Sequence, residues 1–101
     1  MVFVYTTCRD AAEAKKLGRS MVEKRLAACV NITPIESIYE WEGKVVDDQE
    51  AVLLIKTSEP KVAALEELIE KNHSYATPLV GMVEVRRVNR RYKEWMTQVL
   101  D

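Results

Sequence analysis

Three side chains in this 101-residue sequence could bind a soft metal ion: Cys8, Cys29 and His73. Copper prefers sulfur and imidazole ligands, so these residues are the candidates for a copper site. The single histidine excludes a histidine pair within one chain, and no Cys-x-x-Cys motif is present. Cys29 lies between Ala28 and Val30, which is more typical of a small buried side chain than of a ligand. We therefore expect a metal site to use Cys8 and His73, although a loop histidine bonded to the backbone is the commoner arrangement.

A second group of residues could line a cleft between subunits or a site for a small molecule. Lys56 ends an apolar run, and a buried ammonium group needs a carboxylate or an anion as its partner. The expected cleft comprises Tyr39, Trp41, Glu50, Lys56, Tyr75 and Trp95. Within it, Glu50 is the candidate partner of Lys56. An interface ion pair with aromatic packing explains the same residues equally well.

The composition is that of an ordinary globular domain, with 48% hydrophobic and 31% charged residues. This length predicts one domain, residues 1–101. The net charge of −1 provides no field that would attract nucleic acid or an anionic membrane, and no apolar run reaches the roughly 20 residues of a transmembrane helix. We expect neither of these partners. Two free cysteines and a chain that opens on a strand-like segment predict a cytoplasmic protein.

Hydrophobic periodicity predicts four strands and three helices in the order βαββαβα. The predicted strands are 2–8, 29–41, 45–57 and 79–88, and helices are expected to begin after residues 10, 58 and 89. The first helix is expected to have Asp10 and Glu13 as a capping box and to extend to Leu26. Two right-handed crossovers make this an α+β, ferredoxin-like βαββαβ sandwich with a C-terminal helix. In such a sheet the first and third strands are central.

The third strand indicates that both faces of the sheet are covered. Residues 51–55 form a continuous apolar run, in which Val52 and Leu54 point opposite to Leu53 and Ile55. Two helices cover one face only, and the C-terminal helix is too short to cover the other. We therefore infer that partner subunits cover the second face.

A long hairpin between the second and third strands supports the same inference. Residues 29–41 would extend over roughly 43 Å, whereas a compact domain of this length is roughly 34 Å across. Gly43 supplies the positive φ of the turn, and Pro34 should bend or bulge the strand. The projecting tip carries Tyr39, Trp41, Val45 and Val46. Apolar strand ends that are left unpaired favour contact with another chain.

Five segments, in order, resemble motifs of the CutA divalent-cation tolerance family. They are Glu23–Ile32, Ser37–Lys44, Leu54–Thr57, His73–Tyr75 with Pro78, and Tyr92–Trp95. The similarity extends over essentially the whole chain. It implies a cytoplasmic homotrimer of ferredoxin-like subunits, similar in architecture to the PII signal-transduction trimers. It also implies copper or another divalent cation as a bound ion, and no enzymatic reaction.

The sequence departs from the copper-binding pattern of some bacterial members of that family. Those members carry a cysteine in the first strand and two histidines before the tyrosine, where this chain has Thr6, Asn72 and His73. Cys8 is a candidate substitute because it lies two residues beyond Thr6 on the same strand face. Two function classes follow: a metal-binding or metal-tolerance trimer, and a PII-like sensor of an unidentified small molecule or a structural trimeric scaffold.

Overall fold

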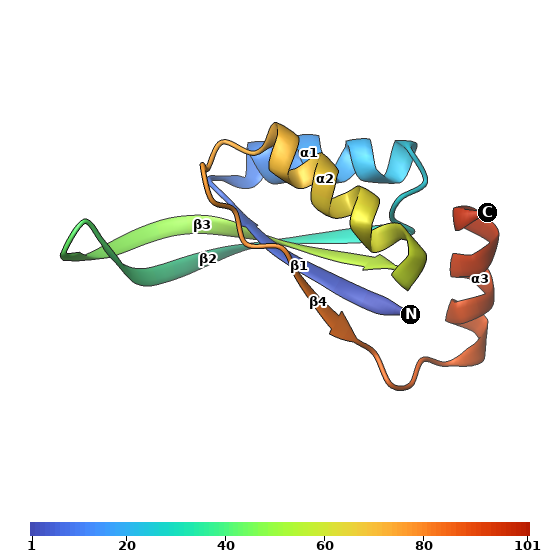
Figure 1. Cartoon of the computed structure of the whole chain (residues 1–101). Helices are drawn as coiled ribbons and strands as arrows, with labels where there is room; N and C mark the ends of the chain where they lie inside the picture. The colour runs from blue at the N-terminus through green and yellow to red at the C-terminus, as the bar shows by residue number, and fades with distance from the viewer.

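The computed structural model describes all 101 residues, and its four strands form one antiparallel sheet. The elements are β1 (Val2–Cys8), α1 (Ala11–Glu23), β2 (Cys29–Trp41), β3 (Lys44–Thr57), the 3-10 turn η1 (Glu59–Lys61), α2 (Val62–Asn72), β4 (Gly81–Glu84) and α3 (Arg90–Leu100). The strand order is β2-β3-β1-β4, and α1 and α2 cover the same face of the sheet (Figure 1). The ferredoxin-like α+β prediction is confirmed, with β1 and β3 in the centre. None of the helices combines the length and the apolar character needed to cross a membrane.

One face of the sheet, here called the helix face, packs against α1 and α2. Alternate residues of the two central strands, among them Val4, Cys8, Leu53 and Ile55, are buried in this core. Gly18 lets α1 approach the sheet, because a Cβ atom there would lie 2.8 Å from Cγ2 of Val30. The chain therefore completes this face by itself.

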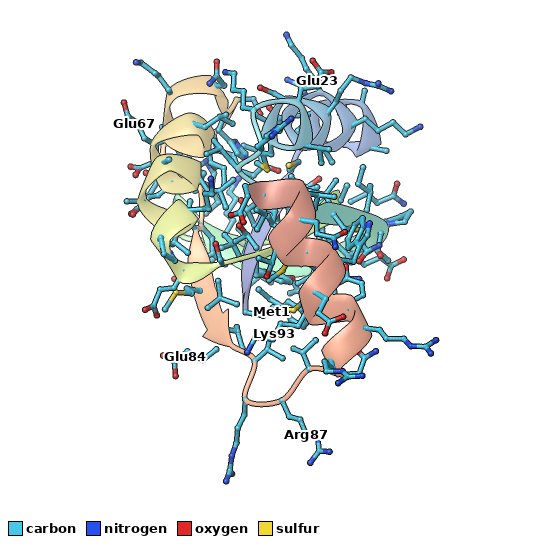
Figure 2. All side chains as sticks on the ribbon, turned by 90° about the vertical axis from the view of Figure 1, so that its right-hand side faces the viewer. Met1, Glu23, Glu67, Glu84, Arg87 and Lys93 are labelled. Atoms are coloured by element: carbon cyan, nitrogen blue, oxygen red, sulfur yellow. The ribbon has the colours of Figure 1, made fainter.

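The opposite face, here called the open face, has no helix over its centre. Its residues alternate with those of the core, and Phe3, Tyr5, Val52 and Leu54 are only partly buried. The last helix, α3, lies across one end of the sheet (Figures 1 and 2). There its buried Met96 and Leu100 pack with Ala28, near the N-terminus. Most of the open face is thus left without a cover within the subunit.

The hairpin of β2 and β3 extends well beyond the rest of the sheet (Figure 1), and the molecule measures 46 Å along its longest axis. The two strands pair in unbroken register from Cys29 opposite Lys56 to Trp41 opposite Lys44. The turn consists of Glu42 and Gly43, both with positive φ, as a two-residue hairpin loop of matching twist requires. The predicted bulge at Pro34 is wrong. Because β2 is an edge strand, the N–H that Pro34 lacks would point away from the ladder.

Two predicted boundaries are also wrong. The fourth strand was expected over residues 79–88, but β4 covers Gly81–Glu84 because its only partner is the β1 segment Val2–Tyr5. The last bond at this edge joins the Val85 N–H to the Met1 carbonyl. The first helix ends at Glu23 rather than Leu26 because Arg25 adopts a left-handed conformation, with φ of 58°.

Candidate functional site

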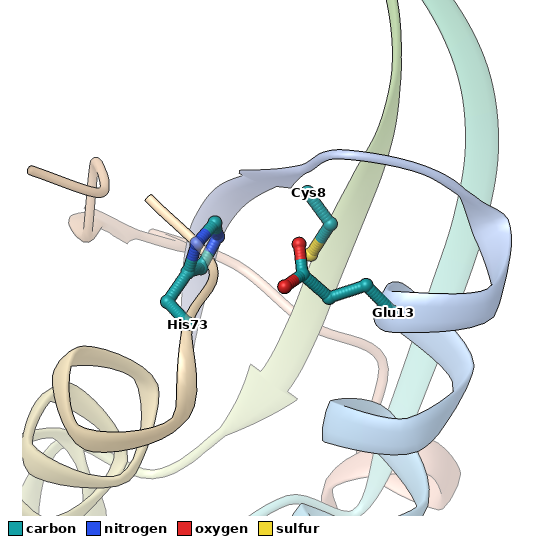
Figure 3. A group of neighbouring side chains, drawn as sticks. All are labelled: Cys8, Glu13 and His73. Carbon is teal, nitrogen blue, oxygen red and sulfur yellow. The ribbon is translucent and has the colours of Figure 1, made fainter. Parts of the chain in front are cut away.

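Three potential metal ligands from separate elements converge at one end of the helix face (Figure 3). Cys8 ends β1, Glu13 lies in the first turn of α1, and His73 follows α2 directly. One ligand atom from each lies within 4.8 Å of the other two. The structure thus brings together Cys8 and His73, the two ligands predicted from the sequence, and adds Glu13. Sequence reasoning assigned Glu13 only to the helix cap, and no local signal places its carboxylate beside Cys8 and His73.

The Glu13 carboxylate links two loops through backbone hydrogen bonds. Its Oε1 accepts from the Arg9 N–H at 2.9 Å and its Oε2 from the Ser74 N–H at 2.9 Å. Asp10 caps the same helix by accepting the Glu13 N–H at 2.8 Å. Burial opposes ionisation of Glu13, but the hydrogen bonds from Arg9 and Ser74 outweigh it and lower its pKa. The site therefore holds a carboxylate that is ionised at neutral pH.

Both ring nitrogens of His73 are engaged by the backbone. Its Nε2 lies 2.8 Å from the Thr7 carbonyl oxygen, and its Nδ1 lies 2.9 Å from the backbone nitrogen of Tyr75. Since Nδ1 accepts the Tyr75 N–H, the ring proton belongs on Nε2, which donates to Thr7. A metal ion bound to His73 would have to replace one of these two backbone contacts.

Cys8 is fully buried, and its thiol is free of any disulfide. Burial and the nearby carboxylates of Glu13, Asp10 and Glu50 raise the pKa of this thiol to about 12. A bound metal ion would therefore have to displace the thiol proton. One sulfur, one imidazole nitrogen and one carboxylate oxygen together suit copper or zinc. Cys29 has no place in this cluster because it lies at the other end of the sheet, opposite Lys56.

A groove of about 650 Å³ lies beside the hairpin, on the side of the open face. Its lining residues are Thr7, Tyr39, Trp41, Glu50, Tyr75, Ala76, Thr77 and Leu79. The Tyr75 hydroxyl donates to Oε2 of Glu50 at 2.6 Å, and the Tyr39 hydroxyl donates to Oδ2 of Asp48 at 3.0 Å. The groove therefore contains four of the six residues predicted to line a cleft.

The other two predicted cleft residues, Lys56 and Trp95, lie apart from the groove. Lys56 is six residues beyond Glu50 on β3, which corresponds to roughly 20 Å. Its Nζ lies 5.6 Å from the ring centroid of Tyr92, which packs in turn against Trp95 at 5.4 Å. The suggested pairing of Lys56 with Glu50 is therefore wrong within one subunit. Tyr92 was not proposed as a cleft residue, although its spacing from Trp95 places both on one side of α3.

Comparison with known proteins identifies the family of this chain. The family model of the CutA1 divalent ion tolerance protein matches residues 2–99. The chain belongs to this family. Names in the CutA1 family describe tolerance to divalent cations and specify no reaction.

Three relatives illustrate how closely CutA proteins resemble this chain. The chloroplastic CutA protein of Arabidopsis thaliana is 44% identical over 96 residues, which cover 94% of this chain and 53% of the relative. The divalent-cation tolerance protein CutA of Thermococcus kodakarensis is 36% identical over 99 residues, covering 98% of this chain and 95% of the relative. The solved structure of the periplasmic divalent cation tolerance protein CutA from Archaeoglobus fulgidus superposes with a TM-score of 0.96, 33% identity and full coverage of both chains. The chain thus spans between half and two thirds of the length of its plant and animal relatives and nearly all of its archaeal ones.

Proposed function

We propose that this CutA1-family protein is a non-enzymatic homotrimer that binds one copper ion per subunit through Cys8 and His73. The observation that carries the proposal is the convergence of sulfur, imidazole and carboxylate donors within 4.8 Å. Glu13 serves as the third donor. Copper(I) is favoured by the thiol and the imidazole, whereas zinc would also accept the carboxylate.

The experiment is a titration of copper(I) against a competing chelator. Cys8→Ser and His73→Ala each remove one donor, and each should lower the affinity by about tenfold or more, with a smaller loss in Glu13→Gln. Cys29→Ser is the matched control, because it removes the other thiol outside the cluster. Unchanged affinity in both Cys8→Ser and His73→Ala would remove this site, and absence of binding in the wild type would overturn the metal function.

The homotrimer is supported by the uncovered open face and by the distribution of charge. Residues 36–50 of the hairpin contain six carboxylates and one lysine, whereas residues 86–93 contain five cationic side chains and no carboxylate. These segments lie at opposite ends of the subunit (Figure 1). A head-to-tail contact between them would be heterologous, and heterologous contacts form a ring when the rotation from one subunit to the next closes. Light scattering at micromolar protein should give about three times the 11.6 kDa chain mass, and a stable folded monomer would contradict the assembly.

A second candidate function, a PII-like small-molecule sensor or scaffold, is favoured by the groove beside the hairpin. We also propose a cytoplasmic location, because both cysteines are free and a reducing compartment keeps them so. The names of relatives place one in the chloroplast and another in the periplasm. Cell fractionation would decide the location of this protein.

A further inference from the structure

We propose that a groove between α1 and α2 binds a small polyphosphate, which is a linear chain of phosphate groups. This groove, here called the helix groove, has a volume of about 340 Å³. Its lining residues are Arg9, Ala12, Glu13, Lys16, Leu17, Ser20, Lys24, Leu68 and Asn72. Three of them are cationic and one is a carboxylate, so the lining as a whole attracts anions. The proposal does not depend on copper binding.

The helix groove stays accessible in the proposed homotrimer. It lies on the outer side of the two helices, and Leu17 and Leu68, which belong to the core, form its floor. The two helices cover one face of the sheet, whereas subunit contacts are proposed for the open face and the hairpin (Figure 1). Lys16 and Lys24 are exposed at the rim of the groove. Assembly of the trimer therefore leaves both lysines free to bind a ligand.

The two lysines of the helix groove have no carboxylate partner. None of the ion pairs within the subunit involves Lys16 or Lys24. The only carboxylate of the lining, Glu13, accepts the Arg9 and Ser74 N–H groups, one with each oxygen, at 2.9 Å. An anionic ligand would therefore supply the negative charge that the two lysines lack, through charge-assisted hydrogen bonds.

Three polar side chains of the helix groove lie in a row. Lys16, Ser20 and Lys24 are spaced four residues apart, which places them on one side of α1 about one turn from each other. Lys24 follows the last helical residue, and its N–H still donates to the Ser20 carbonyl, so the turn continues to this position. The two lysine positions are thus about 12 Å apart along the helix axis. A linear polyphosphate carries its charges in a row and can contact both ammonium groups.

The rest of the lining favours this class of ligand over others. Arg9 adds a guanidinium group, whose fork of N–H donors matches phosphate oxygens, and its Nε pairs with Asp10 at 3.3 Å. A single phosphate group would reach one lysine at a time, and one exposed ion pair contributes little to affinity. The excess of positive charge disfavours metal cations and organic amines. A volume of about 340 Å³ suits a small ligand.

The test is a calorimetric titration of the metal-free protein with sodium tripolyphosphate. Inorganic phosphate and citrate are the comparison ligands, because the first is a single phosphate and the second is a compact anion with three carboxylates. Tripolyphosphate should bind about tenfold more tightly than either, and its affinity should fall as salt is added. In a nitrogen-15 NMR spectrum, the amide signals of Ser20 and Asn72 should shift on binding. The signal of Gly43, at the hairpin turn, should not move.

Two double variants separate the helix groove from the general charge of α1. Lys16→Gln with Lys24→Gln removes two cations of the lining and should weaken tripolyphosphate binding about tenfold. Lys15→Gln with Arg19→Gln is the matched control, because these exposed residues belong to the same helix but not to the lining. The control should change the affinity less than about twofold, since salt screens more distant charges. Circular dichroism and light scattering verify that both variants keep the fold and the assembly.

Three results would overturn the proposal. They are absence of tripolyphosphate binding, equal affinity for the three ligands, and the same affinity in both double variants. Because the titration uses metal-free protein, none of these results would affect the copper titration.

Discussion

Leu53 and Leu54 are neighbours on β3, yet they face two very different environments. Leu53 is fully buried in the core under α1 and α2, whereas Leu54, on the open face, is only partly buried. The helix face is completed by the chain itself, and the open face is not. Successive side chains of a strand point to opposite faces of the sheet, and this alternation alone produces the difference. β3 therefore contributes side chains both to the closed core and to the face that is available to partner subunits.

The two candidate sites differ in the same way. In the Cys8–Glu13–His73 cluster, both ring nitrogens and both carboxylate oxygens already have backbone partners. In the helix groove, Lys16 and Lys24 take part in no ion pair within the subunit. Glu13 connects the two sites, since it belongs to the cluster and also lines the helix groove. A metal ion must therefore replace existing bonds in the cluster, whereas a ligand of the helix groove would add new ones.

The largest effect on stability is expected from a substitution in the core of the helix face. Leu53→Ala should lower the free energy of unfolding by about 2–5 kcal/mol, because it leaves a cavity in a closed core. Leu54→Ala should lower the free energy of unfolding of the subunit by only about 1 kcal/mol, since the Leu54 side chain is only partly removed from water. Denaturant unfolding of both variants measures the difference.

Light scattering in a dilution series measures how these two variants affect the association of subunits. If subunits cover the open face, Leu54→Ala should dissociate at a higher protein concentration than the wild type, and Leu53→Ala should shift dissociation less. The interpretation of the two faces would be wrong if both variants showed the same unfolding and the same dissociation.

A smaller effect is expected at the tip of the hairpin. Trp41 is 64% exposed in the subunit, and aromatic side chains of this kind act as anchors at interfaces. Trp41→Ala should weaken the free energy of association between subunits by about 2 kcal/mol. The melting temperature should then depend more steeply on protein concentration. Ile38→Ala is the control, because Ile38 is 73% exposed on the opposite side of the same hairpin. If Trp41→Ala had the melting temperature and concentration dependence of the wild type, the tip would make no contact with a neighbouring chain.

The sequence by itself determined the order of the elements, the central position of β1 and β3, and the long hairpin with its turn at Gly43. These features depend on local periodicity and on the conformational preferences of nearby residues, which a sequence records directly. The bounds of β2 agree with prediction for the same reason.

Only the tertiary structure decided the features that depend on a distant partner. β4 ends where β1 has no more residues to pair with, although its own sequence would allow a longer strand. Glu13 joins Cys8 and His73 because α1 and the loop after α2 meet at the end of β1. Lys56 is separated from Glu50 because the two residues lie six positions apart on one continuous strand. Each outcome depends on which segments pack side by side, and no local pattern of residues contains that information.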